Sequence, residues 1–187
     1  MVDFGVVLAG RICSGKSTVV DFLTRNFDLG LVSFGSFVRH ECKRRGLTES
    51  RNILQGLGTE MFASMGPELL VTAAMQHAGL HGTQGALFEG VRHLLVLRNI
   101  RARSKKSFCV FLDAGLQVRF TRYVSRSPLH SNISLSQFRA IDDDPIERGI
   151  EPLRGEADAV VDATAPIEIV WQAVCEALEA LGLPKAR

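Results

Sequence analysis

The sequence predicts a three-layer α/β/α domain built on a parallel sheet of about five strands. Short apolar runs alternate with longer segments of helical periodicity, which is typical of consecutive β-α-β units. A glycine-rich segment directly follows the first apolar run. The chain has 187 residues, 46% of them hydrophobic, which is enough for one domain with its own core. We therefore expect a single domain over residues 1–187, with insertions at 36–80 and 122–140.

Charge and hydropathy exclude several classes of protein. The net charge is +2, so no overall field favours a nucleic acid polymer or a membrane as partner. No apolar run reaches the roughly 18–20 residues that span a bilayer. The N-terminus has Asp3 where a signal peptide is basic. We expect a soluble cytoplasmic protein, and no feature of the sequence specifies an oligomeric state.

The four cysteines are scattered along the chain. Cys13, Cys42, Cys109 and Cys175 form no CxxC pair and have no histidine at metal-ligand spacing. Thiols in a reducing compartment fit this pattern better than disulfides or a zinc site. Cys109 and Cys175 lie in apolar stretches, so we expect them to be small core residues.

The first half of the chain supplies three strands and the helices between them. Residues 4–8 form a short apolar run that ends at Gly10 and predict a central strand. The following elements are a helix over 16–25, a strand over 31–33, a helix over 37–45, a broken helical segment over 48–78 and a strand over 86–88. We place the breaks in the long helical segment near Gly56–Gly58 and at Gly66–Pro67.

The second half continues the alternation to the end of the chain. The expected elements are a helix over 92–103, a strand over 108–113, helices over 116–125 and 166–181, and a last strand over 157–161. Residues 126–134 are polar and form a loop. Ser134 with Gln137 predicts a capping box, and Asp144 before Pro145 predicts a second helix start, with Asp144 as its cap.

The segment Gly10-Arg11-Ile12-Cys13-Ser14-Gly15-Lys16-Ser17 matches the phosphate-binding pattern GxxxxGK[ST]. It stands between a predicted strand and a predicted helix, as this loop requires. Backbone N–H groups from Gly10 to Thr18 can surround phosphate oxygens, and the helix adds its positive dipole end. Lys16 can reach the β- and γ-phosphates, and the Ser17 hydroxyl can ligate Mg²⁺. The sequence therefore predicts a site for ATP with Mg²⁺.

A phosphate-binding loop serves proteins of several functions. A GTPase switch should carry DxxG and NKxD motifs, and a transporter ATPase should carry an LSGGQ-like signature; none of these is present. Small-molecule kinases and a few regulatory ATPases remain.

Two further segments resemble the nucleoside monophosphate kinases, relatives of adenylate and cytidylate kinase. Val32-Ser33-Phe34-Gly35-Ser36-Phe37-Val38-Arg39 is similar to that family's [IV]STGDLLR, and Phe88-Glu89-Gly90-Val91-Arg92 is similar to its DGFPR. The resemblance implies that Arg39 and Arg92 hold the acceptor phosphate and that Glu89 supports Mg²⁺.

The resemblance continues around the polar loop. Leu112-Asp113-Ala114 followed by Arg122 and Arg126 resembles the family's lid opening, and Arg139-Ala140-Ile141-Asp142-Asp143 resembles the R-x-D-D that follows the lid. This implies that Lys16, Arg122, Arg126 and Arg139 act on the transferring phosphate. It also implies an acceptor-binding cap over 36–80 and a short lid over 122–140. Arg119 shares the lid helix, and we expect it to be structural.

The chain departs from the family at Ser36, which replaces the usual Asp, and at Gly115, which falls just after a usual Pro. The glycine-rich loop also resembles that of dephospho-CoA kinase. Residues 54–58 would suit the base pocket of phage-type deoxynucleoside monophosphate kinases, with Gln55 contacting the base. The leading hypothesis is an ATP- and Mg²⁺-dependent kinase of a (deoxy)nucleoside monophosphate; a dephospho-CoA kinase and a regulatory ATPase are the alternatives.

Overall fold

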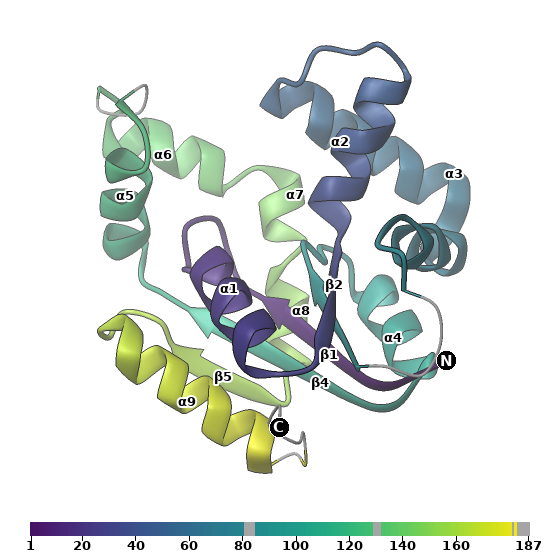
Figure 1. Ribbon diagram of the computed structural model, residues 1–187. Helices are drawn as coiled ribbons and strands as arrows, with labels where there is room; N and C mark the ends of the chain where they lie inside the picture. Colours follow the sequence, from purple (N-terminus) through teal and green to yellow (C-terminus); the bar gives the residue numbers. More distant parts are fainter. Residues whose placement is uncertain (81–84, 129–131, 181, 183–187) are drawn as a thin grey trace.

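The computed structural model describes residues 1–80, 85–128, 132–180 and 182, and Figure 1 shows the arrangement of its elements. Its five strands are β1 (Val2–Ala9), β2 (Leu29–Ser33), β3 (Gly85–Glu89), β4 (Ser104–Asp113) and β5 (Ala159–Asp162). They form one sheet in the order β2-β3-β1-β4-β5, and every neighbouring pair is parallel. The predicted fold class is therefore confirmed.

Helices cover both faces of this sheet. They are α1 (Lys16–Asn26), α2 (Phe34–Arg44), α3 (Arg51–His77), α4 (Leu94–Ala102), α5 (Leu116–Ser125), α6 (Leu135–Asp142), α7 (Pro145–Arg148), α8 (Glu151–Gly155) and α9 (Ile167–Ala180). In Figure 1, α2 and α3 stand on one side above the sheet and α5 and α6 on the other, with α7 between them.

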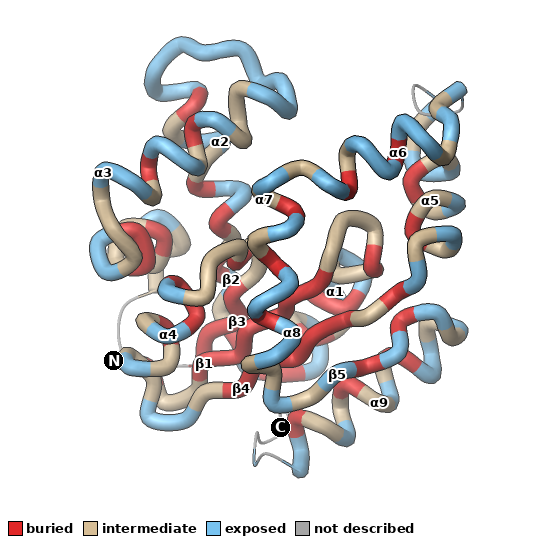
Figure 2. Tube along the Cα trace, turned by 180° about the vertical axis from the view of Figure 1, so that it is seen from behind, coloured by how far each residue is buried: buried red, intermediate tan, exposed pale blue. Residues whose placement is uncertain are grey.

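Alternation along the strands creates two apolar cores. Val6 and Leu8 of β1 pack with α1 and α9 on one face, and Val7 and Ala9 pack with α3, α4 and α8 on the other. Figure 2 shows the consequence: buried residues run along the strands, while the outer surfaces of the helices are exposed. Because both faces are covered, strands such as β4 consist of nearly continuous apolar residues at their buried end.

One of the two predicted breaks in the long helical segment is correct. Gly66 has non-helical dihedral angles (φ 68°, ψ 171°), and Pro67 restarts the helix after this kink. The break expected near Gly56–Gly58 is wrong, because α3 continues through it. Leu57 and Met61 are buried on this stretch, and their packing outweighs the roughly 1 kcal/mol helix penalty of each glycine.

The two predicted helix caps, at Ser134 and Asp144, are confirmed. Ser134 and Gln137 form the capping box of α6, and the Asp144 carboxylate accepts the Ile146 N–H at 2.9 Å. Helix α2 begins three residues before its predicted start, because the Ser33 side chain accepts the Ser36 N–H at 3.1 Å and caps it. Helix α8 was not expected. Residues 129–131 of the predicted loop and Leu181 lie outside the described residues.

Two of the cysteines and the hydropathy of the helices bear on predictions made from composition. Cys109 is fully buried, and Cys175 packs against the α1–α9 core at intermediate exposure, so both contribute to the core as expected. Within the described ranges, no helix combines the length and apolar character needed to cross a membrane.

Candidate active site

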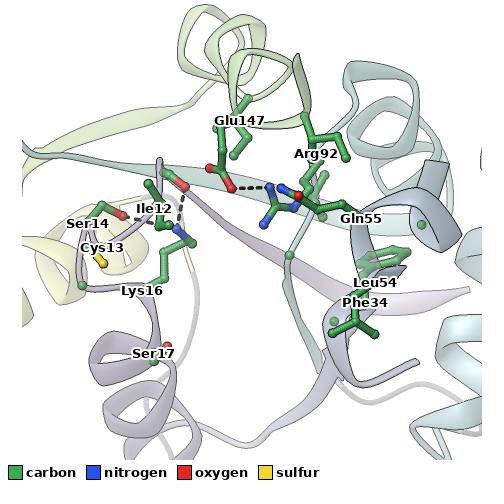
Figure 3. A pocket seen from close by; sticks show the side chains of 18 of the residues that line it. Ile12, Cys13, Ser14, Lys16, Ser17, Phe34, Leu54, Gln55, Arg92 and Glu147 are labelled. Atoms are coloured by element: carbon green, nitrogen blue, oxygen red, sulfur yellow. Dashed lines mark hydrogen bonds and ion pairs between the residues drawn. The ribbon is translucent and has the colours of Figure 1, made fainter. Parts of the chain in front are cut away.

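A cavity of about 1100 Å³ opens at the carboxyl ends of the strands. In a parallel α/β sheet this edge, next to the point where strand order reverses, is where ligands bind. The loop after β1 forms one half of the lining, and α2, α3 and the segment after β3 form the other. In Figure 3 the labelled side chains of these halves face each other across the cavity. We call them the donor half and the acceptor half.

The phosphate-binding loop forms the donor half. Gly15 has φ of +100°, a conformation that favours glycine, and it caps the N-terminus of α1. All predicted loop residues except Arg11 line the cavity; they are Gly10, Ile12, Cys13, Ser14, Gly15, Lys16, Ser17 and Thr18. The loop therefore places the start of α1 and its unpaired N–H groups at the cavity, as an anion site requires.

Lys16 is folded back onto its own loop. Its Nζ donates to the carbonyls of Gly10 at 2.6 Å and Arg11 at 2.8 Å. Burial lowers the pKa of Lys16 to about 8, and the carboxylate of Glu147 opposes this shift. An anionic phosphate would provide the counter-charge that this ammonium group lacks, so the donor half favours a polyphosphate.

A buried ion pair supports the outer side of the loop. Arg119 and Asp142 are 4% and 5% exposed, and the guanidinium contacts both carboxylate oxygens. Arg119 also donates to the carbonyls of Ala114 at 2.8 Å and Ile12 at 3.4 Å. Arg11 reaches the same aspartate, with its Nη2 2.5 Å from the Asp142 carbonyl oxygen. The structural role expected of Arg119 is confirmed, and the side chain of Arg11 serves the same cluster.

Arg122 and Arg126 both line the donor half. Arg122 donates to the carbonyls of Ala163 at 2.7 Å and Ser14 at 3.3 Å, so it connects the loop to the segment after β5. Arg126 is exposed and lies near the Cys13 thiol, whose pKa is raised by burial and lowered in part by that guanidinium. The guanidinium of Arg126 thus lies at the exposed rim of the cavity.

The acceptor half combines arginines with an apolar wall. Arg39, Gln55 and Arg92 line it as predicted, and Arg51 at the start of α3 joins them. The apolar lining comprises Phe34, Val38, Leu54, Phe62, Val96 and Ile150. Phe62 stacks on His93 with ring centroids 4.0 Å apart, and burial lowers the pKa of His93. This half suits a ligand with an anionic group and a flat apolar part.

Glu147, like Arg51, is a residue of the site that the sequence interpretation missed. It is 1% exposed and lines the cavity, although the sequence indicated only the helix start at Asp144 and Pro145 just before it. Its Oε1 accepts from Nη1 of Arg92 at 2.6 Å and lies 3.6 Å from Nη2 of Arg51. Figure 3 shows Glu147 between Lys16 and Arg92. A carboxylate therefore stands where the two halves meet.

Local sequence explains how Glu147 reaches this position. Asp144 and Pro145 begin α7, and the short helix directs Glu147 inward. Gly149 then allows a close approach, because a Cβ there would lie 3.1 Å from the Arg92 carbonyl oxygen. The sequence alone does not reveal this role of Gly149, because the Arg92 carbonyl lies in a segment 57 positions away.

The remaining predicted residues lie around the cavity. Ser17 is exposed at the start of α1 and lines it, while Glu89 at the end of β3 is half-buried and outside the lining. Hydroxyl and carboxylate oxygens are the hard ligands that Mg²⁺ prefers, so the chemistry of each side chain suits the ion. Arg139 is exposed on α6 and is not brought to the cavity.

A phosphate-binding loop at the centre of a parallel β2-β3-β1-β4-β5 sheet defines the P-loop kinase fold. The family model described as "AAA domain" matches residues 10–129, more than half of the chain, and the chain belongs to that family. No curated protein matches the sequence.

Solved structures share the fold at low sequence identity. TT1252 from Thermus thermophilus has a TM-score of 0.62 and 18% identity, over 96% of this chain and 98% of that chain. A gluconokinase from Sinorhizobium meliloti has a TM-score of 0.60 and 14% identity, over 95% and 92%. A shikimate kinase from Bacteroides thetaiotaomicron has a TM-score of 0.57 and 19% identity, over 94% and 98%.

Proposed function

We propose that the chain is a phosphotransferase that moves the γ-phosphoryl group of ATP, with Mg²⁺, to a nucleotide-like acceptor. The observation that carries the proposal is that one cavity holds both a phosphate-binding loop and a second, arginine-lined half with an apolar wall. A protein that only hydrolyses ATP needs the first half alone. Similar folds named shikimate kinase and gluconokinase support transfer to a small molecule.

The donor half supplies positioning and charge, which is most of what phosphoryl transfer requires of a protein. Lys16 would leave its loop carbonyls for the β- and γ-phosphates. Ser17 and Glu89 would hold Mg²⁺, which would supply positive charge to the phosphates. Arg122 and Arg126 would bind the phosphates at the rim, and Arg139 would act if lid closure brings α6 inward.

The acceptor half would bind an anionic group through Arg39 and Arg92 and a ring against the apolar wall, with Gln55 near its edge. The resemblance around residues 32–39 and 88–92 makes a (deoxy)nucleoside monophosphate the first candidate. A nucleotide phosphorylated on a sugar hydroxyl, such as dephospho-CoA, is the second, and one observation favours it: Glu147 places a carboxylate at the junction of the two halves.

The test is ATP consumption with Mg²⁺ across a panel of acceptors. The panel holds the common ribo- and deoxynucleoside monophosphates and dephospho-CoA, with Lys16→Ala as the blank. We expect one acceptor to accelerate ATP consumption strongly. Slow hydrolysis that depends on Lys16 but on none of the acceptors would overturn the proposal and favour a regulatory ATPase.

A further inference from the structure

One oxygen of Glu147 is unused. Oε1 receives Arg92 at 2.6 Å, but Oε2 is buried and has no hydrogen-bond donor among the described residues. A buried carboxylate oxygen without a donor is costly, so such an atom in a ligand cavity indicates a donor that the ligand brings.

The chemistry of Oε2 distinguishes the two classes of acceptor. The nucleophile of a nucleoside monophosphate is an ionised phosphate oxygen, which has no proton to donate and is repelled by a carboxylate. A hydroxyl group does have a proton, and an ionised carboxylate is both its hydrogen-bond acceptor and its general base.

On the basis of the proposed function, we propose that the acceptor presents a hydroxyl group to the γ-phosphate and that Glu147 is the catalytic base that receives the hydroxyl proton. The acceptor class is then an anionic, nucleotide-like alcohol. Its anionic group is held by the arginines of the acceptor half, and its hydroxyl lies against Oε2.

The proton and electron balance is complete within this site. The hydroxyl oxygen attacks the γ-phosphorus as its proton passes to Oε2 of Glu147. The bond between the γ-phosphorus and the β–γ bridging oxygen breaks, and its electron pair leaves with ADP. Glu147 then releases the proton to solvent, so the products are a phosphate monoester, ADP and one proton.

The surrounding charges fit this role. Arg92 uses one of its five N–H donors on Oε1, which fixes the carboxylate and leaves other donors for an anionic group. Lys16 faces the same carboxylate across the cavity, and the charge of Glu147 raises the pKa of Lys16 against the effect of burial. Glu147 thus lies between Lys16, which would contact the donor phosphates, and Arg92, which would orient the acceptor.

The first experiment needs only the wild-type protein. The product of the acceptor panel is analysed by ³¹P NMR, which distinguishes a phosphate monoester from a phosphoanhydride. A monoester supports the inference. An anhydride overturns it while the proposed phosphotransferase function stands, and absence of any acceptor-dependent product overturns the proposed function itself.

The second experiment tests the residue with Glu147→Gln, which keeps the shape but cannot take the proton. We expect kcat with the hydroxyl acceptor to fall by roughly 10²-fold or more, with the KM for ATP little changed. Glu147→Asp should retain part of the activity, and Glu151→Gln, on an exposed carboxylate outside the cavity, should match the wild type. Unchanged kcat in Glu147→Gln would overturn the base role.

Two controls make the variant decisive. ATP affinity and cooperative thermal unfolding show whether Glu147→Gln is folded, and the product analysis stands without it if it is not. A titration with Mg²⁺ tests whether Glu147 instead supports the ion. If excess Mg²⁺ restores kcat in Glu147→Gln, the carboxylate supports Mg²⁺ and the assignment of Glu147 as the base is overturned.

Discussion

The two halves of the cavity are built in opposite ways. The donor half comes from consecutive residues, and its lysine is satisfied by the carbonyls of the same loop, at 2.6 and 2.8 Å. The acceptor half is assembled from α2, α3, the segment after β3 and α7, and Glu147 is the residue that joins the last three. One half is a local structure, and the other exists only in the folded chain.

This difference separates what each half contributes. A contiguous loop binds polyphosphate in proteins of many functions, so the donor half indicates a polyphosphate ligand but does not by itself define the reaction. The acceptor half depends on distances between separate segments, so small changes in packing alter which molecule fits. If the two halves are as independent as this arrangement suggests, a substitution in one half should leave ligand binding in the other nearly unchanged.

The largest effect should come from the donor half. Lys16→Met removes the ammonium group that we propose contacts the β- and γ-phosphates, and we expect the rate of phosphotransfer to fall by about 10³-fold. Acceptor binding, measured separately by calorimetry, should be nearly unchanged. If Lys16→Met weakens acceptor binding as much as it slows transfer, the two halves are coupled and do not bind their ligands independently.

A second prediction concerns the support of the phosphate-binding loop. Asp142→Asn leaves the buried Arg119 without its charged partner, and we expect a loss of about 3 kcal/mol in the free energy of unfolding. Urea denaturation measures this directly. Asp143→Asn, at the neighbouring position on the C-cap of α6, is the matched control and should unfold close to the wild type.

The sequence was sufficient for the donor half and for most of the fold. The loop motif and the caps at Ser134 and Asp144 depend on neighbouring residues, and each is visible in a short window. Local sequence does not predict whether a glycine interrupts a helix, because Gly66 breaks α3 and Gly56 does not. The difference is the buried packing of Leu57 and Met61, which is tertiary.

The acceptor half shows where sequence reasoning stops. Arg39, Gln55 and Arg92 were found through resemblance and do line the cavity, whereas Arg139 was found in the same way and does not. Glu147 carried no signal as a site residue, since its neighbours also explain it as part of a helix start. Its pairing with Arg92 joins positions 55 residues apart, which no local pattern encodes.

A third, smaller effect should appear in the acceptor half. Arg92→Ala removes the guanidinium that we propose binds the anionic group of the acceptor, and we expect kcat/KM for the acceptor to fall by roughly 10- to 100-fold. The affinity for ATP, measured by calorimetry, should stay near the wild-type value. Arg98→Ala is the control because Arg98 is an exposed arginine of α4 that pairs with Glu156 outside the cavity. Equal losses in both variants would remove Arg92 from the acceptor site.

The smallest effect is the most specific to the donor half. Because burial lowers the pKa of Lys16 to about 8, about half of the free protein holds this lysine neutral at pH 8. Bound phosphates favour the charged ammonium, so they raise this pKa, and ATP binding at pH 8 should take up about half a proton. The uptake should fall towards zero near pH 6, and above pH 8 the affinity for ATP should decline.

Calorimetry in two buffers of different ionisation enthalpy measures the number of protons, and Lys16→Arg, which stays charged throughout this range, should abolish the uptake. If the uptake persists in Lys16→Arg, another group takes up the proton on binding, and the lowered pKa of Lys16 is not the property that distinguishes the donor half.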